Sequence, residues 1–244
     1  MNRILNAHLL PEMADPHALA GHTSVVIDVL RASTTITTAL AYGASRIIPC
    51  LAVEEARQLS KQRAGSLLGG ERQGKPIQGF DFGNSPAEYV PERVTGKTIV
   101  FTTTNGTKAM TRCMGSARIL VGAIVNREAL CRQLTTDQRV DLLCAGTNGE
   151  FSMDDALGAG AMVDWLTTDS SGWQLNDGAE ICRSLWQQNV GRSGDPQRIV
   201  ASLEKSMGGR NLMRIGMGSD LSLAGELDCF DCVPNLDKSV WELR

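Results

Sequence analysis

Ser24-Val-Val-Ile-Asp-Val-Leu30 is the stretch of sequence that decides the fold of this chain. Its first residues are β-branched and apolar, and they do not alternate with polar ones. Such a run is typical of a strand buried on both faces, as in a parallel sheet between two layers of helices. A helix is predicted soon after it, over Thr34–Tyr42. The stretch therefore predicts one strand–helix unit of an α/β fold.

Strands and helices alternate from this unit to about residue 165. The predicted strands are Ser24–Leu30, Arg46–Cys50, Ser66–Gly69, Lys97–Thr103, Ala117–Val121 and Val140–Cys144. The predicted helices are Thr34–Tyr42, Val53–Gln62, Thr107–Cys113, Arg127–Leu134, Met153–Leu166, Asp177–Gln188 and Asp195–Lys205. We expect a layered α/β/α fold with a mostly parallel sheet, right-handed crossovers and a ligand site at the carboxyl ends of the strands.

The C-terminal region is rich in glycine and methionine and has no clear periodicity. Residues 208–244 either add strands to the main sheet or form a small extension. Because no low-complexity linker precedes them, residues 1–244 are interpreted as one domain.

Composition excludes several classes of protein. The net charge is −3 and only 5% of the 244 residues are aromatic, which does not favour nucleic acid as a partner. No apolar run reaches the roughly 20 residues of a membrane helix, and the start shows no signal peptide, so no membrane partner is expected. An odd number of cysteines, seven, is typical of reduced thiols and a cytoplasmic location.

Polar residues that suit a binding site gather where predicted strands end. Asp28 ends the first strand and offers a hard oxygen ligand for Mg²⁺. Arg31 offers a planar fork for anionic oxygens, and Ser33 and Thr34 lie where the helix dipole favours an anion. The structural alternative is that Ser33 or Thr34 only caps the helix and Asp28 pairs with Arg31.

Three further segments follow other strands. The first, 69–75, contains Glu71 as a second candidate metal ligand and Arg72 as a second anion clamp. It runs into a long segment whose Phe80 and Phe82 predict that it packs against the protein; the candidate ligand contacts there are Asn84 and Ser85. The other two segments share a Thr-Asn-Gly triplet, interpreted as a tight turn that donates to ligand oxygens; the candidates are Thr104, Asn105, Gly106, Thr107, Asn148 and Gly149. If all strands belong to one open sheet, the four segments share one edge and bind a small anionic, phosphorylated molecule.

Other signals are weaker. Asp154 and Asp155 open a helix, and because neighbouring helical residues point about 100° apart, only one is expected to face the site. Cys229 and Cys232 form a lone CxxC without a partner pair, which does not favour zinc. The three histidines precede the first predicted strand, where surface or packing roles are expected.

These motifs resemble the 2-phosphosulfolactate phosphatases of coenzyme M biosynthesis. The matching stretches are Asp28-Val-Leu-Arg-Ala-Ser-Thr-Thr-Ile36, Gly70-Glu-Arg-Gln-Gly-Lys-Pro-Ile-Gln-Gly-Phe-Asp-Phe-Gly-Asn-Ser-Pro86, Thr103-Thr-Asn-Gly-Thr107 and Gly149-Glu-Phe-Ser-Met-Asp-Asp155 with Ala159-Gly160. They span most of residues 25–160 in the expected order. Asp154-Asp155 stands where the family has Glu-Asp, which makes Asp155 the better match for a metal or catalytic role.

The resemblance implies Mg²⁺-dependent hydrolysis of 2-phospho-3-sulfolactate, or a similar 2-phospho-hydroxy acid, to 3-sulfolactate and phosphate. Our hypothesis is that Asp28, Glu71 and Asp155 hold the Mg²⁺, that the ion lowers the pKa of an attacking water, and that Arg31 and Arg72 clamp the substrate. An aspartyl-phosphate on Asp28 is the rival mechanism.

Two other classes of function stay open at this stage. One is a non-catalytic anion sensor, and the other is an isomerase or lyase that uses the phosphate as a handle. The oligomeric state is also open, with a homo-oligomer formed through the Met-rich tail as one arrangement.

Overall fold

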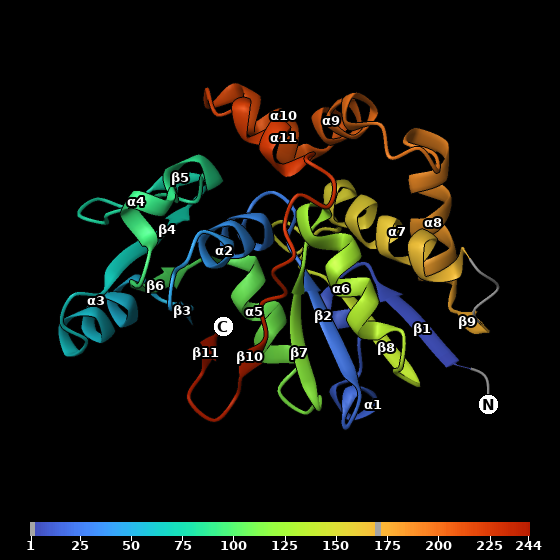
Figure 1. Ribbon diagram of the computed structural model, residues 1–244, viewed down its shortest axis with the longest axis horizontal. Coiled ribbons are helices and arrows are strands. Elements are labelled where there is room, and N and C mark those ends of the chain that lie inside the picture. The colour runs from blue at the N-terminus through green and yellow to red at the C-terminus, as the bar shows by residue number, and fades with distance from the viewer. Residues whose placement is uncertain (1–2, 169–171) are drawn as a thin grey trace.

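The computed structural model describes residues 3–168 and 172–244, and its strands form two sheets. The first sheet has five parallel strands in the order β7-β2-β8-β1-β9 (Figure 1). Their bounds are β1 Arg3–His8, β2 Thr23–Ile27, β7 Arg118–Gly122, β8 Arg139–Cys144 and β9 Trp173–Leu175.

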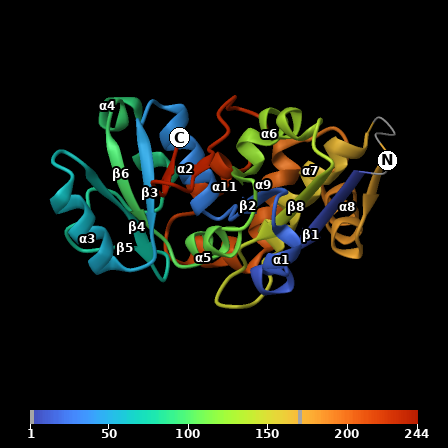
Figure 2. The ribbon, with the colours of Figure 1, turned by 90° about the horizontal axis from the view of Figure 1, so that it is seen from below.

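The second sheet has the order β10-β11-β3-β6-β4-β5. Its bounds are β3 Arg46–Cys50, β4 Leu67–Arg72, β5 Lys75–Pro76, β6 Thr98–Thr102, β10 Leu236–Asp237 and β11 Glu242–Leu243. The three central strands β3, β6 and β4 are parallel, and the outer ones run antiparallel to their neighbours. The two sheets lie side by side along the long axis of the molecule (Figures 1 and 2).

The expectation of one open sheet is wrong, because the strands form two sheets with the C-terminal tail between them. The tail forms an isolated antiparallel bridge from Asn235 to Leu120 of β7, and its last strand pairs with Ile47 of β3. The tail therefore adds strands to the second sheet and runs between the two sheets. The α/β class and the mostly parallel strands are confirmed.

The helices cover both faces of the first sheet. Their bounds are α1 Pro16–Leu19, α2 Ala32–Ala41, α3 Val53–Gln62, α4 Pro91–Val94, α5 Asn105–Arg112, α6 Arg127–Leu134, α7 Met153–Thr167, α8 Asp177–Asn189, α9 Pro196–Lys205, α10 Met207–Arg214 and α11 Ser219–Ala224, with 3-10 turns at Pro11–Met13, Pro86–Glu88 and Ile124–Asn126. Side chains of one sheet face form an apolar core with α6, α7 and α8, and those of the other face form a second core with α2 and α5. Every residue of β2 is buried, as the uninterrupted apolar run predicts.

Local patterns predicted most central elements but missed the first strand. The predicted bounds of β3, α3 and α6 agree with the structure. In β1, Asn6 and His8 alternate with buried apolar residues, so the segment lacks the continuous apolar run of its neighbours. Because β1 includes His8 and lies before His17 and His22, the expectation that the three histidines precede the first strand is wrong.

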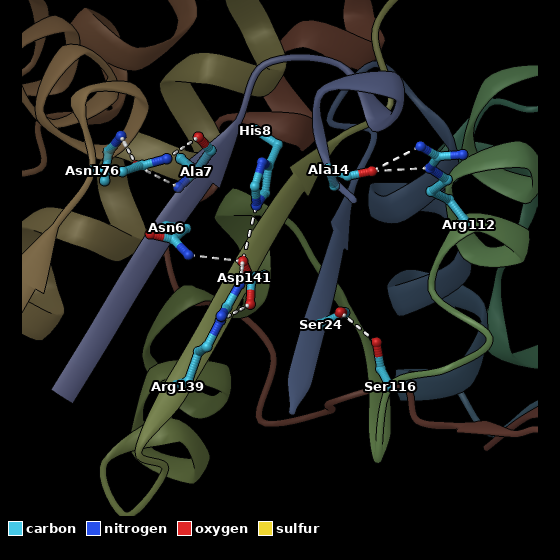
Figure 3. Close-up of polar contacts among 11 residues, drawn as sticks. Asn6, Ala7, His8, Ala14, Ser24, Arg112, Ser116, Arg139, Asp141 and Asn176 are labelled. Atoms are coloured by element: carbon cyan, nitrogen blue, oxygen red, sulfur yellow. Dashed lines mark hydrogen bonds and ion pairs between the residues drawn. The ribbon is translucent and has the colours of Figure 1, made fainter. Parts of the chain in front are cut away.

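Close packing of α7 against α8 and β2 fixes the position of the α7 N-terminus. A Cβ atom built at Gly160 would lie 2.0 Å from the carbonyl oxygen of Cys182 on α8, and one at Gly158 would lie 2.7 Å from Val29. Only glycine allows these approaches. The helix α8 is in turn anchored to β1, because the Asn176 side chain both accepts from and donates to the backbone of Ala7 (Figure 3).

Two negative expectations can be compared with the structure. Within residues 3–168 and 172–244, no helix has both the length and the apolar character needed to cross a bilayer. All seven cysteines are unpaired, and Cys229 is exposed while Cys232 is half-buried.

Candidate active site

Asp28 directly follows β2 and is only 8% exposed. Its Oδ1 accepts a hydrogen bond from the backbone N–H of Ala32 at 3.2 Å. Burial raises the pKa of the Asp28 carboxyl from 3.8 to about 7, and the charges of Asp154 and Glu71 act in the same direction. The influences that lower this pKa are the backbone N–H groups of Ala32 and Gly106. Asp28 is therefore a buried carboxyl that is stabilised by dipoles and faces like charges.

Asp154 and Asp155 lie at the start of α7 and are each 2% exposed. The two oxygens of Asp155 accept backbone N–H groups from Val29 at 2.8 Å and from Gly146 at 2.9 Å. Asp155 therefore ties together the segments that follow β2 and β8. Asp154 accepts a hydrogen bond from the Ser152 hydroxyl at 2.5 Å.

Both carboxyls, and not one, belong electrostatically to the site. Burial raises the pKa of Asp155 well above 3.8, and the charges of Asp154 and Asp28 raise it further. Burial also raises the pKa of Asp154, against the hydrogen bonds of nearby serines. We call Asp28, Asp154 and Asp155 the aspartate cluster. The expectation that only one of the two helical aspartates faces the site is corrected, because both are buried and both interact with Asp28.

Glu71 and Arg72 end β4, as the sequence predicts, and both have partners in the protein. The Oε2 atom of Glu71 accepts the backbone N–H of Gly74 at 2.7 Å within the β4–β5 hairpin. The Arg72 guanidinium donates to the carbonyl oxygen of Leu51 at 2.6 Å and to the Thr102 hydroxyl at 2.9 Å. Arg72 thus links the ends of β3, β4 and β6, while the charge of Glu71 acts on Asp28.

Arg31 is buried, and its guanidinium is held by a residue that the sequence did not indicate. Its Nη1 atom donates to Oδ2 of Asp220 at 2.6 Å, and its Nη2 atom donates to the carbonyl oxygen of Gly74 at 3.0 Å. The alternative pairing of Arg31 with Asp28 is not formed, since the partner carboxylate comes from α11. The only available signal was an isolated aspartate in a tail without periodicity.

Asn84 and Ser85 are buried beside this ion pair. The Ser85 hydroxyl donates to Oδ1 of Asp220 at 2.6 Å. The side-chain oxygen of Asn84 is buried and has no hydrogen-bond partner among the described residues. The segment before them packs down as predicted, because Phe82 is buried and stacks on Tyr89. An unpaired buried amide oxygen next to a buried ion pair is a position where a ligand group gains a hydrogen bond.

The hydroxyl groups after β2 hold the local backbone. Ser33 Oγ accepts from the backbone N–H of Asp28 at 2.9 Å, and Thr34 Oγ1 donates to the carbonyl oxygen of Val29 at 2.8 Å. These contacts shape the segment that carries Asp28 and Arg31.

The two Thr-Asn-Gly triplets have different structures. Asn105 begins α5, with Gly106 and Thr107 in its first turn and Thr104 as a helical N-cap residue without a side-chain cap. The predicted tight turn at this triplet is therefore wrong, because the helix starts two residues earlier than expected. A Cβ at Gly106 would lie 3.1 Å from Oδ2 of Asp28, so glycine lets the uncapped end of α5 approach the aspartate cluster.

The second triplet does form a tight turn. Asn148 and Gly149 have φ angles of 56° and 82°, in the left-handed region that an Asn-Gly pair favours. A bridge from Thr147 to Glu150 closes the turn. Asn148 and Gly149 are both exposed, at the tip of the loop that leads into α7.

A metal site of three protein ligands is not formed in this structure. Among residues 3–168 and 172–244, no three or more His, Cys, Asp or Glu side chains are arranged to hold an ion. The donor chemistry nevertheless suits Mg²⁺, because Asp28 and its neighbours are hard oxygen donors with uncompensated like charges. Mg²⁺ commonly binds through one or two carboxylates and the phosphate of a substrate, so an incomplete protein site is consistent with it.

A second buried aspartate, Asp141 on β8, has a different environment. Its carboxylate accepts hydrogen bonds from Asn6, His8 and Arg139, each at 2.9 Å (Figure 3). Burial alone raises the pKa of Asp141, but these hydrogen bonds outweigh it and lower the pKa to about 2. We call Asp141, Asn6, His8 and Arg139 the Asp141 network. Its charges and hydrogen bonds are satisfied within the protein, which marks it as structural.

The arrangement around Asp28 can bind a phosphate together with a cation. The carboxyls of the aspartate cluster suit a divalent ion, the first turn of α5 presents backbone N–H groups, and Arg31, the N-cap residue of α2, follows Asp28 by three residues. Phosphoryl transfer needs these elements, since a protein accelerates it mainly by positioning groups and neutralising charge.

Comparisons with known proteins all point to one family. Residues 8–239 match the family model of 2-phosphosulpholactate phosphatase. Three relatives carry the name "probable 2-phosphosulfolactate phosphatase". The one from Symbiobacterium thermophilum is 41% identical over 219 residues, which cover 88% of this chain and 91% of the relative. The one from Caldanaerobacter subterraneus is 40% identical and covers 88% of each chain, and the one from Thermotoga petrophila is 40% identical and covers 91% of this chain and 92% of the relative.

Proposed function

Because this chain belongs to the 2-phosphosulpholactate phosphatase family, we propose that it hydrolyses 2-phospho-3-sulfolactate to 3-sulfolactate and phosphate with Mg²⁺ as its metal ion. The family match and the relatives support the phosphatase activity. The Mg²⁺ ion and the exact substrate are our proposal.

The observation that carries the proposal is the uncompensated charge of the aspartate cluster. Burial raises the pKa values of all three carboxyls, and the charges of neighbouring carboxyls raise those of Asp28 and Asp155 further. Buried carboxylates without cationic partners are unfavourable unless they coordinate a metal or lie in a functional site. A divalent ion would supply the missing positive charge, and the phosphate of the substrate would be a further ligand for it.

The residues that would hold Mg²⁺ are Asp28 and one of Asp154 and Asp155 at the start of α7, while Glu71 adds negative charge that acts on Asp28. Bound there, the ion would neutralise phosphate charge and lower the pKa of a water molecule. Arg31 and the first N–H groups of α5 bind the equatorial phosphate oxygens. The buried carbonyl oxygen of Asn84 accepts a hydrogen bond from the substrate or from a water bound with it. A water molecule attacks phosphorus and gives up a proton while the ester P–O bond breaks, and the leaving sulfolactate oxygen takes up a proton, so that no net proton is required.

The rival mechanism is attack by Asp28 itself. Its carboxylate oxygen would bond to phosphorus as the ester P–O bond breaks, and water would then hydrolyse the aspartyl-phosphate. The two mechanisms differ in whether the protein is transiently phosphorylated, because water that attacks phosphorus puts its oxygen into phosphate in both. In the rival mechanism, protein that is acid-quenched during turnover carries a phosphoryl group on the Asp28 peptide, which mass spectrometry detects, whereas direct attack by water leaves Asp28 unmodified.

The test of the proposed function is phosphate release from 2-phosphosulfolactate and close 2-phospho-hydroxy acids, with Mg²⁺ and with a chelator. We expect phosphate release that needs Mg²⁺ and is fastest with the sulfonated substrate. Tight anion binding without phosphate release would favour an anion sensor. Conversion of the substrate with its phosphate retained would favour an isomerase or lyase.

A further inference from the structure

Asp220 on α11 joins two segments of the candidate site. Its Oδ2 atom lies 2.6 Å from Nη1 of Arg31, and its Oδ1 atom accepts the Ser85 hydroxyl at 2.6 Å. Asp220 is 1% exposed and Arg31 is 4% exposed. The Asp220 carboxylate thus contacts with one oxygen a residue that follows β2 of the first sheet. Its other oxygen contacts a residue that follows β5 of the second sheet.

The guanidinium of Arg31 has further contacts that limit its orientation. Nη2 donates to the carbonyl oxygen of Gly74 in the β4–β5 hairpin at 3.0 Å, and Nη1 lies 2.9 Å from the sulfur of Met217. A guanidinium has five N–H donors, so the contacts with Asp220, Gly74 and Met217 leave donors for a ligand. Arg31 is therefore oriented on one side and available on the other.

The position of this ion pair argues against a purely structural role. A buried ion pair adds little to stability compared with apolar residues of similar size, since desolvation offsets the attraction. Arg31 is three residues from Asp28, and pairing between them would neutralise the aspartate cluster. Asp220 instead holds the guanidinium, while the carboxyl of Asp28 keeps a raised pKa. The unpaired Asn84 oxygen lies next in sequence to Ser85, the second partner of Asp220.

We propose that Asp220 is a positioning residue that fixes the Arg31 guanidinium and the Ser85 hydroxyl for the anionic groups of the substrate. This inference rests on the proposed function, because it assumes that Arg31 binds a phosphate-bearing substrate. Asp220 acts through Arg31, so substrate and product binding depend on it more than the chemical step does.

A double-mutant cycle tests whether Asp220 acts through Arg31. The variants are Asp220→Asn, Arg31→Gln and the double variant, and calorimetry measures the Kd of inorganic phosphate in the presence of Mg²⁺. We expect Asp220→Asn to raise the Kd for phosphate and the KM for substrate by roughly tenfold, as for a lost hydrogen bond to a charged group. We expect kcat to change by less than about threefold. The double variant should bind phosphate no more weakly than Arg31→Gln alone, because residues that act as a unit are non-additive.

A matched control is another ion pair of the C-terminal region. Asp228 pairs with Arg127 and accepts the backbone N–H of Glu128, away from the residues that surround Asp28. Asp228→Asn should lower the melting temperature and leave the Kd for phosphate unchanged. Asp220→Glu keeps the charge but lengthens the side chain, and it should give a Kd between those of the wild type and Asp220→Asn; it also serves if Asp220→Asn fails to fold.

Independent effects of Asp220→Asn and Arg31→Gln on the Kd for phosphate would overturn the proposal, as would an unchanged Kd in folded Asp220→Asn or Asp220→Glu protein. Wild-type protein that binds no phosphate would overturn it too. Failure of the proposed function is a separate result: wild-type protein would bind phosphate but release none from 2-phosphosulfolactate, and the cycle would still be measurable.

Discussion

Asp28 and Asp141 are both buried carboxyls associated with neighbouring strands of the first sheet, yet their pKa values shift in opposite directions. Asp141 has three side-chain donors, which lower its pKa to about 2. Asp28 has backbone N–H groups and two nearby negative charges, and its pKa is about 7. The comparison teaches that burial alone does not identify a functional carboxyl. Asp141, which is compensated by an arginine that lies outside the candidate site, supports the fold, whereas Asp28, which has no cationic partner, is prepared for a cation or a substrate.

The largest expected effect is a loss of activity when Asp28 is replaced, in contrast to Asp141. Asp28→Asn should lower kcat/KM for phosphate release by roughly 10³-fold or more, because one charged group of a catalytic unit is removed. Its free energy of unfolding at pH 8 should not fall, since the substitution removes an unfavourable buried charge. Steady-state kinetics and denaturant unfolding measure both quantities. Near-normal turnover would remove Asp28 from the site under either mechanism.

The pH dependence of stability provides the next distinction. In chelator, the native state keeps the proton of Asp28 up to about pH 7, whereas the unfolded chain loses it near pH 3.8. The native state thus binds more protons in this window, and the free energy of unfolding should fall as the pH rises through it. The raised pKa of Asp28 corresponds to a decrease of about 4 kcal/mol in the free energy of unfolding across this pH window.

Asp141 contributes to the free energy of unfolding with the opposite dependence on pH, and it does so in a lower pH range. It is present above pH 3.8 and lost as the pH falls towards 2. The Asp28 contribution is measured by denaturant unfolding of wild type and Asp28→Asn between pH 4 and pH 8, as the difference between the slopes of their free energies of unfolding against pH. Equal slopes for the two proteins would contradict the raised pKa of Asp28.

The third prediction concerns the Asp141 network. Asp141→Asn should lower the free energy of unfolding by about 3 kcal/mol, near the low end for a broken buried ion pair, since Arg139 keeps some contact with water. Turnover per folded molecule should stay within about threefold of the wild type. A large loss of kcat in stable Asp141→Asn protein would place this network in the catalytic site and remove the contrast with Asp28.

Sequence patterns predicted the central elements because each reports a local property. The apolar runs of β2 and β6 identified strands buried on both faces, and the polar residues after them identified the site segments. The strand β1 was missed because Asn6 and His8 serve the Asp141 network, which interrupts the apolar pattern. The division into two sheets depends on a short C-terminal ribbon whose pairing no local pattern indicates.

Part of the site was also predicted, because those residues lie in segments with a local sequence signal. Asp28, Arg31 and Ser85 follow strands or lie in marked loops, and Arg31 and Ser85 are brought together by their shared partner Asp220. Asp220 was not predicted, because its pairing with Arg31 spans 189 residues and the tail around it has no periodicity. The role of Asp154 beside Asp155 was undecided because spacing on a helix does not report the electrostatic interaction with Asp28.

The most direct test of the central claim is a Mg²⁺ titration followed by thermal unfolding of wild type, Asp28→Asn and Asp141→Asn. If the aspartate cluster lacks a cation, Mg²⁺ at 100 times its Kd stabilises the wild type by about 2.7 kcal/mol. The account predicts the same gain in Asp141→Asn and little or none in Asp28→Asn. A wild-type protein that Mg²⁺ does not stabilise, or an equal gain in Asp28→Asn, would contradict it.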